Sequence, residues 1–302
     1  MMLDEAQRRP RALIVGCGYV GQRLATRLAD TYHVTATVRS PQRVAELETA
    51  GIKTAALDLD QVRDSAWFQN QAQPAAVFYL APPPPHGESD IRLDRFLRLT
   101  TVAPLAFIYI STTGVYGDTG GELVDESSPV NPMTDRARRR VSAEEMTRVW
   151  CTERGVRRVV LRVPGIYGPG RLPIERLQRG EPTLDPQDAG LTNRIHVDDL
   201  VEACTAAALA PQACGVYNIT DGNATSSTAF LDRLAELAGL PSAPRISLDE
   251  AQLTLSPERL SYLNESRQVS NQRMLTHLRV KLRYGNLDDG LRHSLEQAYT
   301  NR

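Results

Sequence analysis

Short apolar segments alternate with amphipathic segments along the first two thirds of the chain. The apolar segments, each of which predicts a strand, are residues 12–15, 34–38, 54–57, 76–80, 105–110 and 158–163. Between them apolar residues recur at helical spacing, as at Val20, Leu24 and Leu28. Continuous apolar strands separated by helices indicate a parallel sheet that is covered on both faces. The pattern therefore predicts an α/β protein with a doubly wound parallel-sheet Rossmann fold.

The alternation of strand and helix ends near residue 220. A helix start at Thr225 or Ser226 and a polar helical end then predict a smaller C-terminal substrate-side region. We expect residues 11–165 to form a dinucleotide-binding domain to which 193–220 return, and residues 166–192 and 221–302 to form the smaller region. Residues 82–85, four prolines in a row, predict a rigid loop after the fourth strand.

Composition and charge narrow the classes of function. The chain has 302 residues, of which 41% are hydrophobic and 24% charged, and 35 basic residues nearly balance 36 acidic ones. This is the composition of a globular protein, and its net charge of −1 gives no general reason to bind nucleic acid or an acidic membrane. The polar start predicts no signal peptide and no apolar run approaches about 20 residues, so we expect a cytoplasmic protein without a membrane span.

Neither a disulfide framework nor a metal site is predicted. The four cysteines are scattered, without the CxxC spacing or neighbouring histidines of a metal site: Cys17, Cys151, Cys204 and Cys214. In a chain of this length we expect them to be reduced.

Residues 12–21 read ALIVGCGYVG, which predicts a strand, a tight turn and a helix start. Gly16 allows the turn, Gly18 lets a pyrophosphate approach the backbone, and Gly21 lets the helix pack on the strand. The helix N-terminus, with Tyr19 and Val20, offers N–H groups and a positive dipole end to phosphates. We therefore expect a dinucleotide site, the alternative being a structural turn.

The end of the second predicted strand favours NADP(H) over NAD(H). An NAD site usually has a carboxylate there to accept hydrogen bonds from the ribose 2′-hydroxyl. Here the strand is followed by RSPQR, so that Arg39 can pair with a 2′-phosphate and Arg43 adds a second cation. Ser40 can cap the next helix, and Pro41 suits its first position. The alternative is that Arg39 is a solvated loop residue.

Four further motifs follow in order: ISTTGVYG at 110–117, LRVPGIYGPGR at 161–171, IHVDDL at 195–200 and VYNI at 216–219. With the glycine turn, they resemble the extended short-chain dehydrogenases/reductases, the NAD(P)-dependent epimerase/dehydratase family. The resemblance covers nearly the whole chain.

This resemblance implies roles for particular residues. Thr112 would hold the substrate oxygen, with Ser111 as the alternative, and Tyr116 would lie near the cleft in a mainly structural role. Further implied cofactor contacts are Asp58 and Leu59 at the adenine, Leu80, Ala81 and Pro82 beside the nicotinamide ribose, and Pro164, Gly165, Ile166 and Tyr167 under the nicotinamide. The resemblance also suggests a homodimer, through the fourth and fifth helices.

The family's Tyr-x-x-x-Lys pair is missing. In the register of PMTDRARRRVSAE at 132–144, Arg136 stands at the tyrosine position and Arg140 at the lysine position. No tyrosine occurs between Tyr116 and Tyr167. Arg140 could still hold the ribose, but an arginine stays protonated and cannot act as a base near neutral pH. The chain thus resembles an atypical, YeeZ-like branch that keeps the cofactor turn and lacks the tyrosine.

The three arginines Arg136, Arg139 and Arg140 would form a basic face if their helix is regular. Facing the cleft, they could bind an anionic group of a substrate or effector; the alternative is partial exposure with Glu144 and Glu145 as ion-pair partners. Other groups that could move a proton are Tyr116, His86, His196, Asp118, Asp125 and Glu126, although each has a more ordinary structural interpretation.

Two functions therefore stay open. The chain is an NADP(H)-dependent oxidoreductase or epimerase/dehydratase with an unconventional proton donor, or it binds NADP(H) without turnover as a sensor or scaffold.

Overall fold

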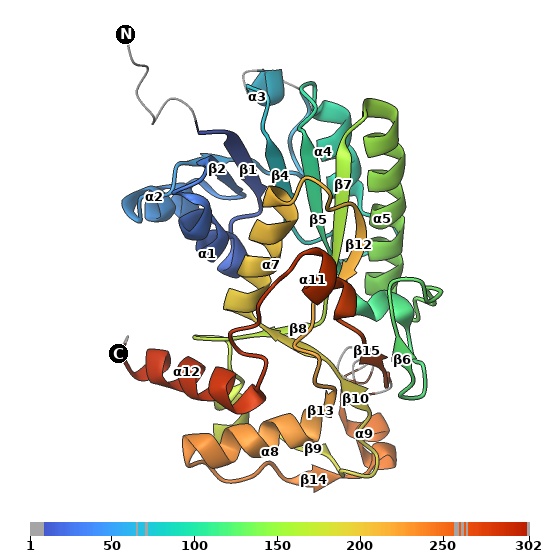
Figure 1. Cartoon of the computed structure of the whole chain (residues 1–302). Helices are drawn as coiled ribbons and strands as arrows, with labels where there is room; N and C mark the ends of the chain where they lie inside the picture. Colours follow the sequence, from blue (N-terminus) through green and yellow to red (C-terminus); the bar gives the residue numbers. More distant parts are fainter. Residues whose placement is uncertain are drawn as a thin grey trace.

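The computed structural model describes residues 9–64, 66–69, 72–256, 260, 263 and 265–300. Most of the polar start considered above, residues 1–8, lies outside the described residues. Seven parallel strands form the central sheet in the order β12-β7-β5-β4-β1-β2-β3 (Figure 1). Their bounds are β1 Arg11–Val15, β2 His33–Val38, β3 Thr54–Ala56, β4 Ala76–Tyr79, β5 Ala106–Thr112, β7 Arg157–Val163 and β12 Gly215–Asn218.

All six strands predicted from apolar segments are present, within one or two residues of the expected bounds. The direction in which successive strands are added to the sheet reverses at β1. This strand pairs with β2 on one side and with β4 on the other. In such sheets ligands bind outside the carboxyl ends of the strands at this switch point. The predicted α/β fold with a doubly wound parallel sheet is confirmed.

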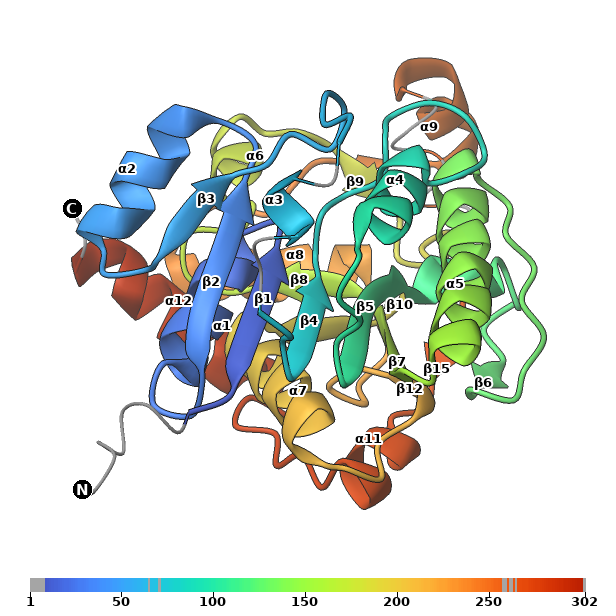
Figure 2. The same ribbon diagram turned by 90° about the horizontal axis from the view of Figure 1, so that it is seen from above.

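Helices cover both faces of the sheet, as the view in Figure 2 shows. Their bounds are α1 Tyr19–Leu28, α2 Pro41–Thr49, α3 Ala66–Gln69, α4 Ile91–Leu99, α5 Asp135–Arg154 and α7 Val197–Leu209. Ile14 points into the core with Leu24 of α1 and Leu200 of α7, whereas Val15 points into the core with Phe96 of α4. This alternation explains why the strands are continuously apolar.

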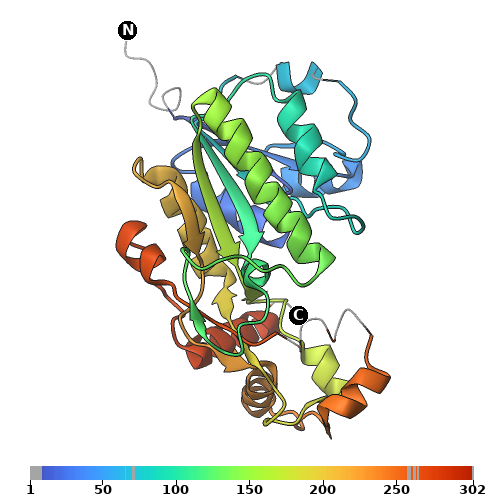
Figure 3. The same cartoon turned by 90° about the vertical axis from the view of Figure 1, so that its right-hand side faces the viewer.

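A smaller region lies beyond the carboxyl ends of the strands (Figures 1 and 3). It contains short strand pairs: β8 Gly165–Tyr167 with β11 Arg194–His196, β9 Thr183–Leu184 with β14 Arg245–Ile246, β10 Leu191–Thr192 with β13 Thr225–Ser226, and β6 Leu123–Val124 with β15 Gln268–Val269. The helices of this part of the sequence are α6 Ile174–Gln178, α8 Ser227–Ala238, α9 Leu248–Thr254, α11 Gln272–His277 and α12 Leu287–Thr300. Tyr167, Phe230 and Leu291 share its core.

Several local predictions can be compared with the structure. Ser226 caps α8, since its hydroxyl accepts the N–H of Ala229 at 3.0 Å. Ser40 occupies the N-cap of α2 but makes no capping hydrogen bond with its side chain. Met274 of α11 packs in the same core as Ile14 of the central sheet. Its position in the sequence had predicted that it belongs to the smaller region. Among the described residues, no helix is long and apolar enough to cross a membrane.

Candidate functional site

The glycine turn between β1 and α1 leaves room for a ligand at one position and none at two others. A Cβ on Gly16, whose φ is +94°, would lie 2.6 Å from the nitrogen of Ala81, and one on Gly21 would lie 2.9 Å from the Gly16 oxygen. At Gly18 a Cβ would meet nothing within 4 Å. Gly18 is also the N-cap of α1, and no side chain caps this helix. An open, uncapped helix start fits a phosphate group.

Tyr19 joins this turn to the segment that follows β8. Its hydroxyl donates to the carbonyl of Pro169 at 3.0 Å. The guanidinium groups of Arg23 and Arg171 lie 4.1 and 4.8 Å from the centre of its ring. The glycine turn and the motif at 161–171, about 150 residues apart in sequence, are therefore in contact.

The end of β2 is basic and carries no carboxylate in residues 39–43. Arg39 is exposed. The pKa of the Asp60 carboxyl is lowered, chiefly by its hydrogen bonds from Arg92 and to a smaller extent by the charge of Arg39. Arg43 pairs with Glu46.

The backbone around the two residues predicted to meet the adenine is held by hydrogen bonds. The Asp58 carboxylate accepts the N–H of Asp60 at 2.9 Å, and Leu59 accepts a hydrogen bond from Arg95 through its carbonyl. Leu59 is buried.

The proline loop after β4 is fixed from α4. Arg92 donates to the carbonyls of Pro82 and Pro83, both at 3.1 Å, and pairs with Asp60. Because the glycine turn packs against the backbone of Leu80 and Ala81, these bonds fix the segment predicted to lie beside the nicotinamide ribose.

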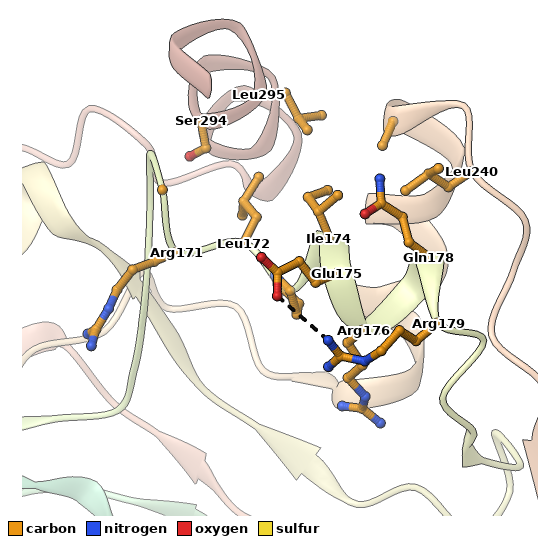
Figure 4. A pocket seen from close by; sticks show the side chains of 13 residues that line it. Arg171, Leu172, Ile174, Glu175, Arg176, Gln178, Arg179, Leu240, Ser294 and Leu295 are labelled. Atoms are coloured by element: carbon orange, nitrogen blue, oxygen red, sulfur yellow. Dashed lines mark ion pairs between the residues drawn. The ribbon is translucent and has the colours of Figure 1, made fainter. Parts of the chain in front are cut away.

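Two cavities are lined in part by residues of the motif at 161–171, whereas neither the glycine turn nor the ends of β2 and β4 line them. The larger, of about 620 Å³, lies among α6, the end of α8 and α12; Figure 4 shows Glu175 facing Arg179 in its wall. Of the predicted motifs, only Gly170 and Arg171 reach it. The second, of about 580 Å³, lies at the carboxyl ends of β5 and β7. Arg176 lines both cavities.

The second cavity brings together seven of the predicted site residues. Those that line it are Ser111, Thr112, Arg136, Arg140, Pro164, Gly165 and Ile166. We regard this cavity as the candidate site, because it holds the hydroxyl pair at the end of β5, whereas the larger cavity does not.

Thr112 and Ser111 differ in what their hydroxyl groups do. Thr112 Oγ1 accepts the N–H of Gly114 at 3.2 Å, so its hydrogen can be donated to a ligand. The Ser111 hydroxyl, on a side chain that is nearly fully buried, donates to Glu144 Oε1 at 2.5 Å. Glu144 also pairs with Arg162 at 2.8 Å. Thr112 is therefore the better placed of the two to meet a substrate oxygen.

The expected basic face of α5 is divided in the structure. Arg136 and Arg140 line the cavity, but Arg139 is buried and donates to the carbonyl of Gly87 at 2.6 Å. The expected ion-pair partners are also wrong. Glu144 pairs with Arg162, whereas Glu145 pairs with Arg148 on the exposed side of the helix.

Arg140 connects the cavity to the core. One of its nitrogens donates to the hydroxyl of Tyr109 at 3.0 Å and to the carbonyl of Ile110 at 2.9 Å. Burial raises the pKa of Tyr109 to about 12, so this phenol stays protonated near neutral pH. Tyr109 does not line the cavity.

The two tyrosines that the sequence analysis singled out, Tyr116 and Tyr167, are buried. Tyr116 donates to Asn218 Oδ1 at 2.8 Å, and burial raises its pKa. Tyr167 packs with Phe230 in the core of the smaller region, where burial raises its pKa as well. Neither is among the lining residues, nor are His86, His196, Asp118, Asp125 and Glu126.

Sequence reasoning missed the residues that close the cavity from the other side. These are Asn193 and Arg194 at β11 and Glu265 and Arg267 before β15. The motif IHVDDL begins at the residue after Arg194. Only this closeness in sequence could have suggested Arg194 as a site residue. The segment 265–267 carries no pattern in the sequence.

His196, Asp198 and His293 form the one group of possible metal ligands in the described chain, with ligand atoms within 4.8 Å of one another. His196 caps α7: its Nδ1 accepts the N–H of Asp198 at 3.2 Å. That bond occupies the lone pair which a metal would need. Burial lowers the pKa of His196 to about 3, so the ring is neutral.

The comparisons with known proteins agree on one family. The model of the NAD dependent epimerase/dehydratase family matches residues 12–220. Protein YeeZ of Escherichia coli K12 is 29% identical over 251 residues, which cover 80% of this chain and 89% of YeeZ. The predicted resemblance to a YeeZ-like branch is confirmed.

Solved structures agree in fold. A functionally unknown conserved protein from Silicibacter pomeroyi has a TM-score of 0.80 and 28% identity, covering 96% of this chain and 99% of its own. UDP-glucuronic acid 4-epimerase from Bacillus cereus, in complex with NAD, has a TM-score of 0.76 and 20% identity, covering 96% and 97%. At this identity the second likeness shows the fold alone.

Proposed function

The chain belongs to the NAD dependent epimerase/dehydratase family, and on that premise we propose that it is an NADP(H)-dependent oxidoreductase or epimerase/dehydratase that works without the Tyr-Lys pair. One observation carries the proposal: the open glycine turn and the cavity lined by Thr112 lie at the same edge of the sheet. Both follow carboxyl ends of parallel strands, where ligands of such sheets bind.

The preference for NADP(H) is supported by the end of β2. Arg39 is exposed there, and no carboxylate of residues 39–43 would repel a 2′-phosphate. The 4-epimerase from Bacillus cereus is in complex with NAD, so the proposed preference sets this chain apart from that structure. Arg39 would form a charge-assisted hydrogen bond with the phosphate.

The proposed roles of the lining residues follow from their contacts. NADP(H), when bound, supplies or accepts a hydride. Thr112 donates a hydrogen bond to the substrate oxygen, and Arg140 offers positive charge to the same oxygen or to the ribose hydroxyls. Pro164 and Ile166 form an apolar wall that limits water. Arg136 holds its proton and does not act as a base.

A second candidate function is NADP(H) binding without turnover, as a sensor or scaffold. The composition of the cavity wall favours it: no tyrosine, histidine, cysteine or lysine occurs among the described lining residues. The titratable lining groups in that set are arginines and Glu265, which is already paired with Arg267.

Cofactor titration followed by a substrate screen tests both candidates. We expect NADPH to bind more tightly than NADH in a fluorescence titration, and a carbonyl compound to oxidise bound NADPH. Thr112→Val should then reduce turnover and leave NADPH affinity unchanged, because Thr112 touches the substrate. Tight NADPH binding without turnover on sugars, aldehydes or ketones favours the sensor. Failure to bind either nucleotide contradicts both candidates.

A further inference from the structure

The cavity that holds Thr112 has an excess of positive charge. In the described part of the chain, five arginines and one glutamate line it: Arg136, Arg140, Arg176, Arg194, Arg267 and Glu265. They come from α5, α6, β11 and the segment before β15. These charges are brought together only by folding, and near-neutral overall composition gives no sign of them.

Arg267 and Arg176 each pair with a carboxylate. Arg267 Nη2 lies 2.6 Å from Glu265 Oε2, and both side chains are largely buried. Arg176 Nε lies 3.7 Å from Glu181 Oε2, and another of its nitrogens donates to the carbonyl of Pro182. These two arginines therefore add little net charge to the cavity.

Arg194 is different, because its hydrogen bonds go to uncharged groups, while the carboxylate of Asp221 acts on it only through its charge. Arg194 is 8% exposed to solvent. It donates to the hydroxyl and carbonyl of Thr225, at 2.7 and 3.1 Å, and to the carbonyl of Ser226 at 3.3 Å. No carboxylate in the described chain lies within ion-pair distance of it. Burial lowers the pKa of Arg194 to about 10, which still leaves it charged at neutral pH.

Arg136 reaches the same cavity from α5, one helical turn before Arg140. It is half-buried. Arg140 is engaged with Tyr109 and Ile110, on the side proposed for the ribose. Arg136 and Arg194 thus lie on different walls of the cavity whose lining also includes Thr112.

We propose that this cavity binds the oxyanion of a small organic acid, a carboxylate or a phosphate ester, with Arg194 and Arg136 as its cationic partners. The planar guanidinium group matches either oxyanion in two parallel hydrogen bonds. Arg194 is a buried cation whose hydrogen-bond partners in the described chain are uncharged, and an incoming oxyanion would offset part of the cost of burying its charge. The substrate would carry this group on the molecule whose carbonyl or carbinol oxygen meets Thr112.

The proposed anion site and the proposed function can be contradicted independently of each other. Assigning the anion to the substrate rests on the proposed function, whereas anion binding itself does not. The test therefore uses the protein without nucleotide and follows malonate and inorganic phosphate by calorimetry in a low-chloride buffer. NADPH binding is measured on the same samples.

Three variants make the test specific. Arg194→Gln and Arg136→Gln keep hydrogen-bond donors but remove a lining charge, whereas Arg98→Gln removes an exposed charge on α4 that pairs with Asp94. We expect at least one anion to bind the wild type and Arg98→Gln alike, and to bind each cavity variant at least about tenfold more weakly. NADPH affinity should be unchanged in Arg194→Gln.

Each result has a defined meaning. Tighter binding of malonate indicates a carboxylate substrate, and tighter binding of phosphate indicates a phosphorylated one; both support the site. Binding that survives both cavity substitutions lies elsewhere and overturns the proposal, as does the absence of millimolar binding by either anion. Should Arg194→Gln fail to fold, Arg136→Gln decides alone. Anion binding without NADPH binding would contradict the proposed function and leave the anion site standing.

Discussion

Arg162 and Glu144 form a buried ion pair, with Nη2 2.8 Å from Oε2 and Nε 3.1 Å from Oε1. The pair joins β7 to α5, and the Ser111 hydroxyl on β5 donates to the same carboxylate. The helix that carries Arg136 and Arg140 is thereby held against the strand that ends in Thr112. Glu144 thus positions the wall of the candidate site from within the core.

Removing the charge of Glu144 should destabilise the protein strongly. In Glu144→Gln the guanidinium of Arg162 would stay buried without its counter-charge, which typically costs about 3–5 kcal/mol. Chemical denaturation measures the change in the free energy of unfolding. The matched control is Glu145→Gln, whose side chain pairs with Arg148 at the surface and whose loss should leave stability unchanged. Equal stability of the two variants would contradict the positioning role.

Two glycine substitutions in one turn should have different effects. Gly16→Ala forces a side chain onto backbone with φ +94° and against Ala81, so we expect loss of stability together with loss of nucleotide binding. Gly18→Ala meets no protein atom within 4 Å, so the melting temperature should stay the same while nucleotide affinity falls at least about tenfold. If Gly18→Ala binds NADPH as the wild type does, the phosphate does not approach this backbone.

Arg39→Ala tests the choice of cofactor. Loss of a charge-assisted hydrogen bond to the 2′-phosphate is worth about 1.5–3 kcal/mol, which corresponds to a roughly ten- to hundredfold weaker affinity for NADPH. NADH lacks this phosphate, so its affinity serves as the internal control and should not change. Fluorescence titration of both nucleotides measures the ratio. Unchanged NADPH affinity would contradict the assignment of Arg39.

His196 should stay neutral well below the usual pKa of histidine. Its folded-state pKa is lowered to about 3 by burial and then by the charges of His293, Arg23 and Arg283, whereas an unfolded histidine has a pKa of about 6.5. Between these values the folded protein binds fewer protons, so His196 contributes stability that is complete above about pH 6.5 and declines as the pH falls toward 3.

Titration of the imidazole carbon-bound protons by NMR gives the direct measurement for His196. We expect no shift of its signal between pH 8 and pH 4, while a midpoint near pH 6 would contradict the burial argument. Global stability is a poorer readout, because the pKa of Asp221 is raised to about 6, chiefly by burial. That shift acts in the opposite sense over much of the same pH range.

Much of the fold could be read from local patterns. The strands were predictable because a strand buried on both faces needs an apolar side chain at nearly every position, as β4 shows. The glycine turn was predictable because Gly16 and Gly21 are required by close backbone contacts that no other residue allows. Four residues that line the candidate cavity were also singled out from the sequence: Ser111, Thr112, Arg136 and Arg140.

The partners of those residues could not be predicted in the same way. Helical spacing placed Arg136, Arg139 and Arg140 on one face of α5, yet Arg139 turns to Gly87 while the other two line the cavity. Adjacent positions on a helix differ in direction by about 100°, so neighbours in sequence can face different surroundings. Glu144 likewise pairs with Arg162 on the neighbouring strand β7 and not with an arginine of its own helix.

The sequence by itself determined the parallel sheet, the tight glycine turn after β1 and the absence of a tyrosine between Tyr116 and Tyr167, because each depends on residues within one short segment. The charge of the candidate site was decided only by tertiary structure. Arg194 and Glu265 reach the cavity of Thr112 from segments 82 and 153 residues farther along the chain. Which charges share a cavity depends on how β11 and the segment before β15 pack beyond the sheet, and no local pattern records that arrangement.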